Sequence, residues 1–320
     1  MKAAVIYQNG SPEVLAYQDI ADPVCDPDGI VIRVEAISVE GGDLLQRLRG
    51  PVVTSPHVIG YQAAGEIIAV GTKVTQFQCG QRVVTVNSYG SHAALRAVPA
   101  RNAWLVPDGL DIRQAAAIPV AFGTADECLF HRGGLKAGET VLIQAGASAV
   151  GIAAIQLAKR AGARVIATAS SDERLARLAP LGLDHGINYS RADVVAEVRA
   201  LTEDRGVDVV VDPVGGETLQ DSIRSLAYGG RLSMVGFASR KPATVDVASL
   251  LRGNQNLAGI FLAPELGTDR VHDNIQRLII EVSSGALRVV LDRTFPLSEG
   301  AAAHAYIESR QAVGRVLLIP

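Results

Sequence analysis

The chain of 320 residues has room for about two domains, and its 48% hydrophobic and 20% charged residues allow it to bury a large core. Its formal net charge of −3, without a run of Lys or Arg, argues against nucleic acid as a partner. No apolar run is long enough to cross a membrane, and MKAAVIYQNG is too short for a signal peptide, so we expect a globular cytoplasmic protein.

The first part of the chain, residues 1–118, consists of short β-type runs separated by Gly and Pro. The runs are KAAVIY, GIVIRVEAISV, AAGEIIAVG and QRVVTV, and turn dipeptides stand at Asp28-Gly29, Gly71-Thr72 and Cys79-Gly80. Such short runs, which alternate or are β-branched, predict a mostly antiparallel, barrel-like domain.

From residue 119 the pattern changes to strands that alternate with helices. The runs TVLIQAG, ARVIATAS, HGINY and VDVVVDPVG precede helical stretches at 149–161, 172–180, 191–202 and 216–227, and GRLSMVGF and NLAGIFL follow. This alternation predicts βαβ units and a doubly wound parallel sheet over 119–262. Residues 263–320 are too few for a domain of their own, so we expect them to complete the first one. The predicted fold class is α/β.

The segment IQAGASAVGIAAIQL has the outline of a dinucleotide-binding loop, G-x-G-x-x-G, with Gly146 and Gly151 at the outer positions and Ser148 in the middle. It follows an apolar strand and opens a helix, as the mechanism of that loop requires. Backbone N–H groups and the helix dipole can then receive a diphosphate. A tight strand-to-helix turn is the alternative, and the context favours a nucleotide.

Residues about 20 positions further on decide between NADPH and NADH, because NAD-binding chains have Asp or Glu there to bind the ribose 2′-hydroxyl. Here Ser170 and Ser171 occupy that place, and Arg174 follows. Two hydroxyls and a guanidinium suit a 2′-phosphate better than a free hydroxyl. A serine at this point can also cap the next helix, and the two roles are compatible.

Taken together, these motifs resemble the medium-chain dehydrogenase/reductase superfamily, in its zinc-independent quinone oxidoreductase branch, from Met1 to Pro320. The resemblance is carried by PHVIGYQAAGEIIAVG, QAAAIPVAFGTA, VLIQAGASAVGIAAIQLAK, GINY, VDVVVDPVGGETL, GGRLSMVGF and VGRVLLIP. It implies a GroES-like catalytic domain built from both chain ends and a central Rossmann domain.

The resemblance also implies a set of NADPH contacts. For the apolar members of this set, ordinary sheet core is the alternative role. The residues are Thr124, Ser148, Ala149, Val150, Ser170, Ser171, Arg174, Tyr189, Gly236, Phe237, Ile260, Phe261, Leu262 and Arg315.

The comparison with zinc-dependent relatives argues against a metal. Their Cys and His ligands correspond to Glu40 and Tyr61 here, and the Glu of their G-H-E motif corresponds to Gln62. The three cysteines are far apart and the six histidines are scattered, so no ligand set is recognisable. Glu40 also replaces the Asn that this branch usually carries in N-x-x-D, which leaves the substrate open.

These features predict an NADPH-dependent reductase that passes hydride to a quinone or another α,β-unsaturated carbonyl compound. Tyr61 and Glu40 are the candidates for donating a proton or hydrogen bond to the developing oxyanion, although Tyr61 can simply pack and Glu40 can bind a loop amide. A biosynthetic enoyl reductase or dehydrogenase for a dedicated metabolite and a non-catalytic NADPH-binding protein are the alternatives. The apolar run at 256–262 predicts a sheet edge that pairs in a homodimer.

Overall fold

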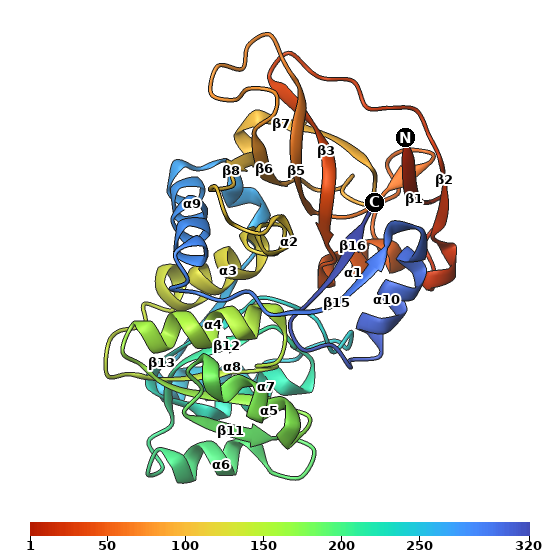
Figure 1. Cartoon of the computed structure of the whole chain (residues 1–320). Helices are drawn as coiled ribbons and strands as arrows, with labels where there is room; N and C mark the ends of the chain where they lie inside the picture. Colours follow the sequence, from red (N-terminus) through yellow and green to blue (C-terminus); the bar gives the residue numbers. More distant parts are fainter. The chain divides into compact units, whose positions relative to one another are not determined.

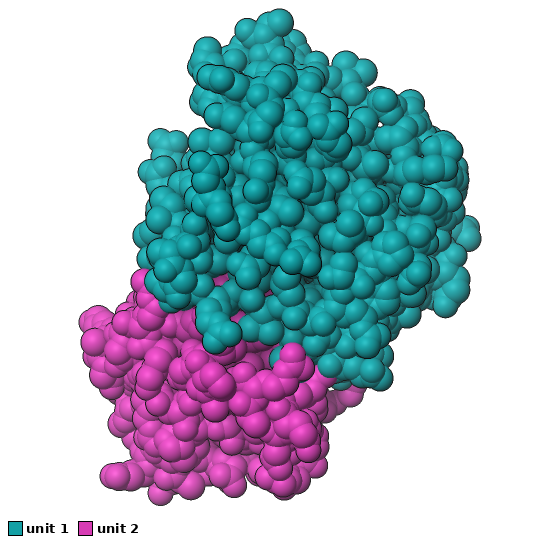
Figure 2. All heavy atoms as spheres, viewed as in Figure 1, with its two compact units in different colours: residues 1–120, 263–320 teal, residues 121–262 magenta.

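The computed structural model describes residues 1–320, and the chain divides into two compact units (Figure 2). Unit 1 comprises Met1–Val120 and Ala263–Pro320, and unit 2 comprises Ala121–Leu262. Both ends of the chain therefore belong to unit 1. Figure 1 labels most of the strands and helices.

Unit 1 is built on β-sheets. A seven-stranded sheet has the order β15-β16-β3-β5-β6-β8, with β7 paired to β3, and a three-stranded sheet has the order β2-β1-β4. All pairs are antiparallel except β15 with β16. The strands are β1 Lys2–Ile6, β2 Ala16–Asp19, β3 Gly29–Ser38, β4 His57–Val58, β5 Gln62–Val70, β6 Arg82–Val86, β7 Leu95–Pro99, β8 Ala103–Leu105, β15 Leu291–Pro296 and β16 Arg315–Ile319.

The C-terminal strand β16 is part of this sheet because Leu318 pairs with Ile37 of β3. Ile37, Ile67 and Leu318 all lie in one apolar core. The helices of unit 1 are α1 Gly41–Arg49, α2 Ile112–Ala115, α9 Asp269–Ser283 and α10 Gly300–Glu308. Helix α1 was not predicted, since it opens with two glycines, which are poor helix formers. Its first turn is held instead by the Asp43 carboxylate, which accepts from the Glu40 backbone N at 2.8 Å.

Unit 2 contains a six-stranded parallel sheet of order β11-β10-β9-β12-β13-β14. Numbered from β9, this is the 3-2-1-4-5-6 order of a doubly wound Rossmann fold. The strands are β9 Thr140–Ile143, β10 Arg164–Ala169, β11 His185–Asn188, β12 Val207–Asp212, β13 Leu226–Met234 and β14 Asn256–Gly259. Every residue of β9 is buried, as expected for a central parallel strand.

Five helices follow strands of unit 2: α4 Ala149–Arg160, α5 Asp172–Leu178, α6 Val194–Leu201, α7 Glu217–Ser225 and α8 Val247–Gly253. Helix α3, Pro119–Asp126, begins in unit 1 and ends in unit 2. None of the helices has the length and apolar character needed to cross a membrane. The α/β prediction is confirmed.

The last strand of the sheet is shorter than predicted. The run NLAGIFL was expected to be strand throughout, but β14 ends at Gly259, so Ile260, Phe261 and Leu262 lie beyond it. The Ile260 backbone N still donates to Met234 O at 2.8 Å. Because β13 ends at Met234, no further residue of that strand remains to extend the ladder.

Candidate functional site

In unit 2, the loops that follow β9, β10, β12 and β13 lie at the carboxyl edge of the parallel sheet. The strand order reverses between β9 and β12, which are neighbours in the sheet. In open α/β sheets, ligands bind outside the carboxyl ends of the strands at such a switch point. The candidate nucleotide site is therefore this edge, termed the coenzyme edge below.

The loop after β9 has the close backbone approaches of a phosphate loop. A Cβ on Gly146 would lie 2.8 Å from the Ala167 Cβ, and one on Gly151 would lie 2.5 Å from the Ala145 carbonyl oxygen. Only glycine fits at both places. Ser148 fits at the middle position because its backbone is extended and its Oγ caps α4, accepting from the Gly151 N at 3.1 Å.

The cap leaves the Ser148 hydroxyl hydrogen available to a ligand, since Oγ acts here as an acceptor. Ala149 and Val150 form the first turn of α4, where backbone N–H groups have no partner within the helix. Ser148, Ala149 and Val150 stay the predicted contacts of a diphosphate.

The loops after β10 and β11 bring the predicted 2′-phosphate residues to one place. Ser170 and Ser171 follow β10, and Tyr189 follows β11, its backbone N donating to Ala169 O at 3.1 Å. Ser171 Oγ accepts from the Arg174 N at 3.4 Å, so Ser171 is also the cap of α5. The position of Ser171 is therefore compatible with both of the roles considered for it, binding the 2′-phosphate and capping the helix.

Two acidic residues, Asp172 and Glu173, follow these serines, and the charge of Asp172 is compensated. Arg191 forms an ion pair with the Asp172 carboxylate at 2.7 Å, and Asn188 donates to it at 3.1 Å. Sequence reasoning missed Asn188 and Arg191, because their role depends on the pairing of β10 with β11. An anionic group placed beside Ser170 would therefore meet a compensated Asp172 carboxylate, but also the exposed carboxylate of Glu173, whose pKa is lowered by a hydrogen bond from Ser171.

The loops after β12 and β13 approach each other closely. A Cβ on Gly236 would lie 2.6 Å from the Pro213 carbonyl oxygen, and Gly215 has a φ of 64°. Phe237 is 49% exposed and Phe261 is 72% exposed, so both rings lie at the surface rather than in the sheet core. Thr124 lies in α3 and is buried.

Unit 1 contains a second candidate region, a buried polar cluster around Glu40. Glu40 directly precedes α1, and its Oε1 accepts from Ser38 Oγ at 2.9 Å and from Gln62 Nε2 at 2.5 Å. Its Oε2 forms an ion pair with Arg315 of β16. Burial raises the pKa of Glu40, and Arg315, Ser38 and Gln62 oppose that shift. With three donors directed at it, this carboxylate is an acceptor, which argues against its predicted role as a proton donor.

Tyr61 is held beside this cluster by three contacts. Its backbone N donates to Asp43 at 3.1 Å, and its carbonyl accepts from Arg96 at 2.6 Å. A Cβ on Gly42 would lie 2.2 Å from the Tyr61 ring, so the ring rests directly on the Gly42 backbone. Burial, with the charges of Asp43 and Glu40, raises the pKa of Tyr61 to about 12. The phenol is consequently neutral at pH 7 and can donate a hydrogen bond.

Three polar residues that position this cluster, Asp43, Gln62 and Arg96, were not among the predicted site residues. Gln62 joins the Glu40 carboxylate to α3, because its Oε1 accepts from the Val120 N at 3.1 Å. Burial raises the pKa of Asp43 well above its usual range, and the same effect lowers that of Arg96 to about 9. Two of them carried a signal in the sequence, because Asp43 belongs to the N-x-x-D segment and Gln62 stands at the Glu of the G-H-E motif of zinc-dependent relatives, whereas Arg96 carried none.

The cluster does not fit a catalytic zinc. The positions that correspond to Cys and His ligands in zinc-dependent relatives hold Glu40 and Tyr61. Glu40 is engaged by Arg315, and Tyr61 is a neutral phenol, whereas zinc ligands are thiolates, imidazoles or carboxylates. No group of three or more His, Cys, Asp or Glu side chains is arranged to hold a metal ion.

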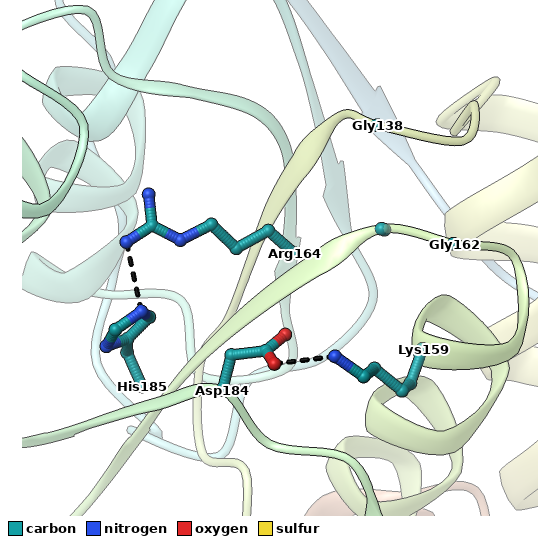
Figure 3. A pocket seen from close by; sticks show the side chains of 7 residues that line it. Gly138, Lys159, Gly162, Arg164, Asp184 and His185 are labelled. Carbon is teal, nitrogen blue, oxygen red and sulfur yellow. Dashed lines mark hydrogen bonds and ion pairs between the residues drawn. The ribbon is translucent and has the colours of Figure 1, made fainter.

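A surface hollow of about 300 Å³ lies elsewhere in unit 2 (Figure 3). Its lining includes Lys159, which pairs with Asp184 at 2.6 Å, and Arg164, which contacts His185 at 3.0 Å. Since β10 and β11 begin at Arg164 and His185, this hollow lies at the amino edge of the sheet. Ligands of doubly wound sheets bind at the opposite edge, so the hollow is not the candidate site.

Comparison with known proteins agrees with this organisation. The family model of the alcohol dehydrogenase GroES-like domain matches residues 26–108, and that of zinc-binding dehydrogenases matches residues 149–279. The chain is 33% identical to a 2-haloacrylate reductase of Burkholderia sp, over 99% of this chain and 98% of that protein. It is 32% identical to a quinone oxidoreductase of Pseudomonas aeruginosa, over 97% of each chain. The solved quinone oxidoreductase of Escherichia coli complexed with NADPH superposes with a TM-score of 0.95 at 27% identity, covering 100% of both chains.

Proposed function

Because this chain belongs to the quinone oxidoreductase branch of the medium-chain dehydrogenase/reductase superfamily, we propose that it is an NADPH-dependent reductase of quinones or other α,β-unsaturated carbonyl compounds. The engagement of Glu40 by Arg315, Ser38 and Gln62 is the observation that carries the proposal. A site without a metal suits acceptors that are already electrophilic, because their reduction needs no Lewis acid.

The coenzyme would bind at the coenzyme edge of unit 2. Bound NADPH supplies the hydride from its nicotinamide ring. Ser148, Ala149 and Val150 would hold the diphosphate at the start of α4. Ser170, Ser171, Arg174 and Tyr189 would hold the 2′-phosphate and adenosine. Thr124, Gly236, Phe237 and Ile260–Leu262 are assigned to the nicotinamide end.

Arg315 has a different place from the one implied by the resemblance, in which it reaches the coenzyme. Its guanidinium pairs with Glu40 and donates to the Val39 carbonyl at 3.3 Å. We therefore assign Arg315 to the buried cluster of unit 1, where it compensates the Glu40 carboxylate.

Tyr61 is the group proposed to assist the acceptor. Hydride addition places negative charge on the acceptor oxygen as an enolate or phenolate, and a fixed hydrogen-bond donor stabilises that charge. Tyr61 is neutral at pH 7 and is held through Asp43, Arg96 and Gly42. Glu40 would position Gln62 and Arg315 and would not transfer a proton.

Steady-state oxidation of NADPH against a panel of quinones and enones tests the proposal. We expect turnover with several of them, and a decrease in kcat of roughly a hundredfold for Tyr61→Phe, with little change in NADPH affinity. Tyr7→Phe is the matched control, since Tyr7 is exposed and its hydroxyl accepts only a surface hydrogen bond from Gln18. Full activity of Tyr61→Phe would remove Tyr61 from the mechanism.

The replacement of the usual Asn by Glu40 favours a second candidate, an enoyl reductase or dehydrogenase for one dedicated metabolite. Such an enzyme would reduce one class of enone in the panel and leave quinones unchanged. A protein that binds NADPH without oxidising it in the presence of any acceptor would be the non-catalytic alternative.

We also propose a homodimer formed through β14. This strand pairs with β13 on one side and forms the edge of the sheet, and the exposed Phe261 follows it. Unpaired edges of this kind readily pair with another chain. Gly259→Pro, which removes a ladder donor, is expected to weaken association in analytical ultracentrifugation. A monomer of 33.5 kDa for the unaltered chain would contradict the dimer. Location in the cytoplasm remains a prediction.

A further inference from the structure

A hydrogen-bonded series of buried polar side chains lies beneath the coenzyme edge of unit 2. Its members are Gln144 at the end of β9, Thr168 on β10, Asp212 at the end of β12 and Ser222 on α7. Each is at most 2% exposed, although none belongs to the predicted coenzyme contacts. Buried polar groups are costly unless they are paired, so their arrangement calls for a structural reason.

The hydrogen bonds between these side chains all run in one direction. The Ala145 backbone N donates to Thr168 Oγ1 at 3.1 Å, and Thr168 Oγ1 donates to Gln144 Oε1 at 2.8 Å. Gln144 Nε2 then donates to Ser222 Oγ at 3.1 Å, and Ser222 Oγ donates to Asp212 Oδ2 at 2.9 Å. Every donor thus points toward the Asp212 carboxylate, and hydrogen bonds aligned in this way polarise and strengthen one another.

The two ends of this series of hydrogen bonds lie in two different loops of the coenzyme edge. Ala145, in the phosphate loop, has a φ of 49°, which is a left-handed conformation that costs energy for a residue other than glycine. At the other end, Asp212 Oδ1 accepts from the backbone N atoms of Val214 at 2.8 Å and Gly215 at 2.9 Å. One carboxylate therefore organises the loop after β12 directly and the phosphate loop through three side chains.

We propose that Thr168, Gln144, Ser222 and Asp212 form a positioning relay that holds the phosphate loop in its binding conformation before NADPH arrives. The relay fixes Ala145 in its left-handed conformation and so sets the entry of the chain into α4. Because its side chains are at most 2% exposed, the relay acts on the loop and has no surface with which to bind the coenzyme itself. This inference rests on the proposed coenzyme site for its effect on affinity, but not for its effect on the loop itself.

Thr168 gives the sharpest test, because its hydroxyl can be removed without changing its volume. Thr168→Val leaves the Ala145 N–H without its acceptor, whereas Thr168→Ser keeps the hydroxyl and loses only a methyl group. We expect Thr168→Val to raise the Kd of NADPH by about tenfold and Thr168→Ser to restore most of the affinity, as for a buried hydrogen bond that is lost and regained. The KM for the acceptor should be unchanged.

Amide hydrogen exchange on the protein without coenzyme supplies a second readout. The peptide that contains Ala145–Ala147 should exchange faster in Thr168→Val than in Thr168→Ser. Ser222→Ala should behave like Thr168→Val, since it interrupts the relay at its centre. Ser225→Ala is the matched control, because Ser225 is equally buried on α7 but donates only to the Asp221 carbonyl of its own helix, at 2.8 Å.

Unchanged exchange in both Thr168→Val and Ser222→Ala would overturn the relay. So would a Thr168→Ser variant as impaired as Thr168→Val, since the loss would then come from packing. If the unaltered protein fails to bind NADPH, the proposed function fails, while the exchange experiment still decides whether the relay holds the loop.

Discussion

The coenzyme edge of unit 2 and the polar cluster of unit 1 are built in different ways. The phosphate loop is formed by one continuous segment, in which Gly146 and Gly151 allow backbone to approach backbone. The cluster is formed by Glu40, Gln62 and Arg315, which come from distant parts of the chain and meet because β3 pairs with both β5 and β16. A site made of local backbone geometry depends on short-range sequence, whereas a site made of buried charges depends on the whole domain.

The cluster should consequently be far more sensitive to single substitutions than the coenzyme edge. Arg315→Met leaves the buried Glu40 carboxylate without its counter-charge, and such a loss typically costs 3–5 kcal/mol, so we expect a decrease of about 4 kcal/mol in the free energy of unfolding of unit 1. Urea unfolding followed by the fluorescence of Trp104 measures this, because Trp104 is the one tryptophan of the chain and lies buried in unit 1.

The double variant Glu40→Gln/Arg315→Met is the control for this prediction. It removes both charges, so it should be more stable than Arg315→Met alone. Arg315→Lys keeps the charge and should be the least affected of the three. If Arg315→Met loses less than about 1 kcal/mol, the pair behaves as an exposed ion pair does, and the contrast with unit 2 disappears.

The coenzyme edge should respond in affinity and not in stability. Arg174→Ala removes a charged donor from the proposed 2′-phosphate site, and a hydrogen bond to a charged group is worth roughly 1.5–3 kcal/mol, so we expect at least about a tenfold loss of NADPH affinity. The affinity for NADH should be unchanged. Fluorescence titration with both coenzymes measures the two values, and equal affinity of the unaltered protein for both would contradict the assignment.

Arg177→Ala provides a matched control for Arg174→Ala. Arg177 lies on the same helix, α5, but one turn further from its N-terminus. Its removal should leave the ratio of the two affinities as it is. A loss of NADPH preference as large as that of Arg174→Ala would indicate a general charge effect in place of a specific contact.

The same contrast explains which features could be predicted from the sequence. The alternation of strands and helices in unit 2 and the phosphate loop could be predicted, since each depends on residues close in the chain. The capping of α4 by Ser148 and the beginning of α5 at Asp172 follow from local propensity. The family resemblance supplied the assignments that lie further apart.

Most of the features that could not be predicted depend on long-range pairing, and helix α1, which depends on a local capping contact, is the exception. Helix α1 begins at Gly41 against its propensity because the Asp43 carboxylate holds the Glu40 backbone N. The strand β14 ends at Gly259 because its neighbour β13 ends at Met234. The relay from Thr168 to Asp212 depends on the register of β9, β10 and β12, which no single segment encodes.

The buried polar groups of unit 1 should also give it a distinctive dependence on pH. Nε2 of His92 lies 3.1 Å from Nε2 of His304, and both rings are fully buried. Burial, with the nearby charge of Arg96, lowers the pKa of His92 to about 3, and burial, with His92 and Arg47, lowers that of His304 well below its usual value. Both imidazoles are therefore neutral in the folded protein and protonate more readily when it unfolds.

The sign of the effect follows from this difference. Stability is fully present above a pH of about 6.5, the unfolded value, and is lost as pH falls toward about 3, by up to roughly 1.4 kcal/mol per pH unit for each histidine. His304→Gln should remove one of these contributions, so its stability relative to the unaltered protein should rise on acidification from pH 6.5 to 5.5. His131→Gln, an exposed histidine of unit 2, is the control and should leave the Trp104 unfolding curve unchanged. A parallel pH dependence of His304→Gln and the unaltered protein would show that the pKa of His304 is the same in the folded and unfolded states, which would contradict the prediction.

The smallest expected effect concerns metal. Neither region offers a ligand set. In the cluster Arg315 pairs with Glu40 and Tyr61 is a neutral phenol, and no group of three or more His, Cys, Asp or Glu side chains is arranged to hold a metal ion. Dialysis against a chelator should therefore leave the rate of acceptor reduction and the Trp104 unfolding curve unchanged, and elemental analysis should find less than one zinc per chain. A catalytic zinc needs about three protein ligands and polarises its substrate directly, so its removal would abolish turnover. Recovery of activity only after adding Zn²⁺ would mean that Glu40 leaves Arg315 to bind the ion. The cluster would then be a metal site closed by an ion pair, and the proposed role of Tyr61 would have to be abandoned with it.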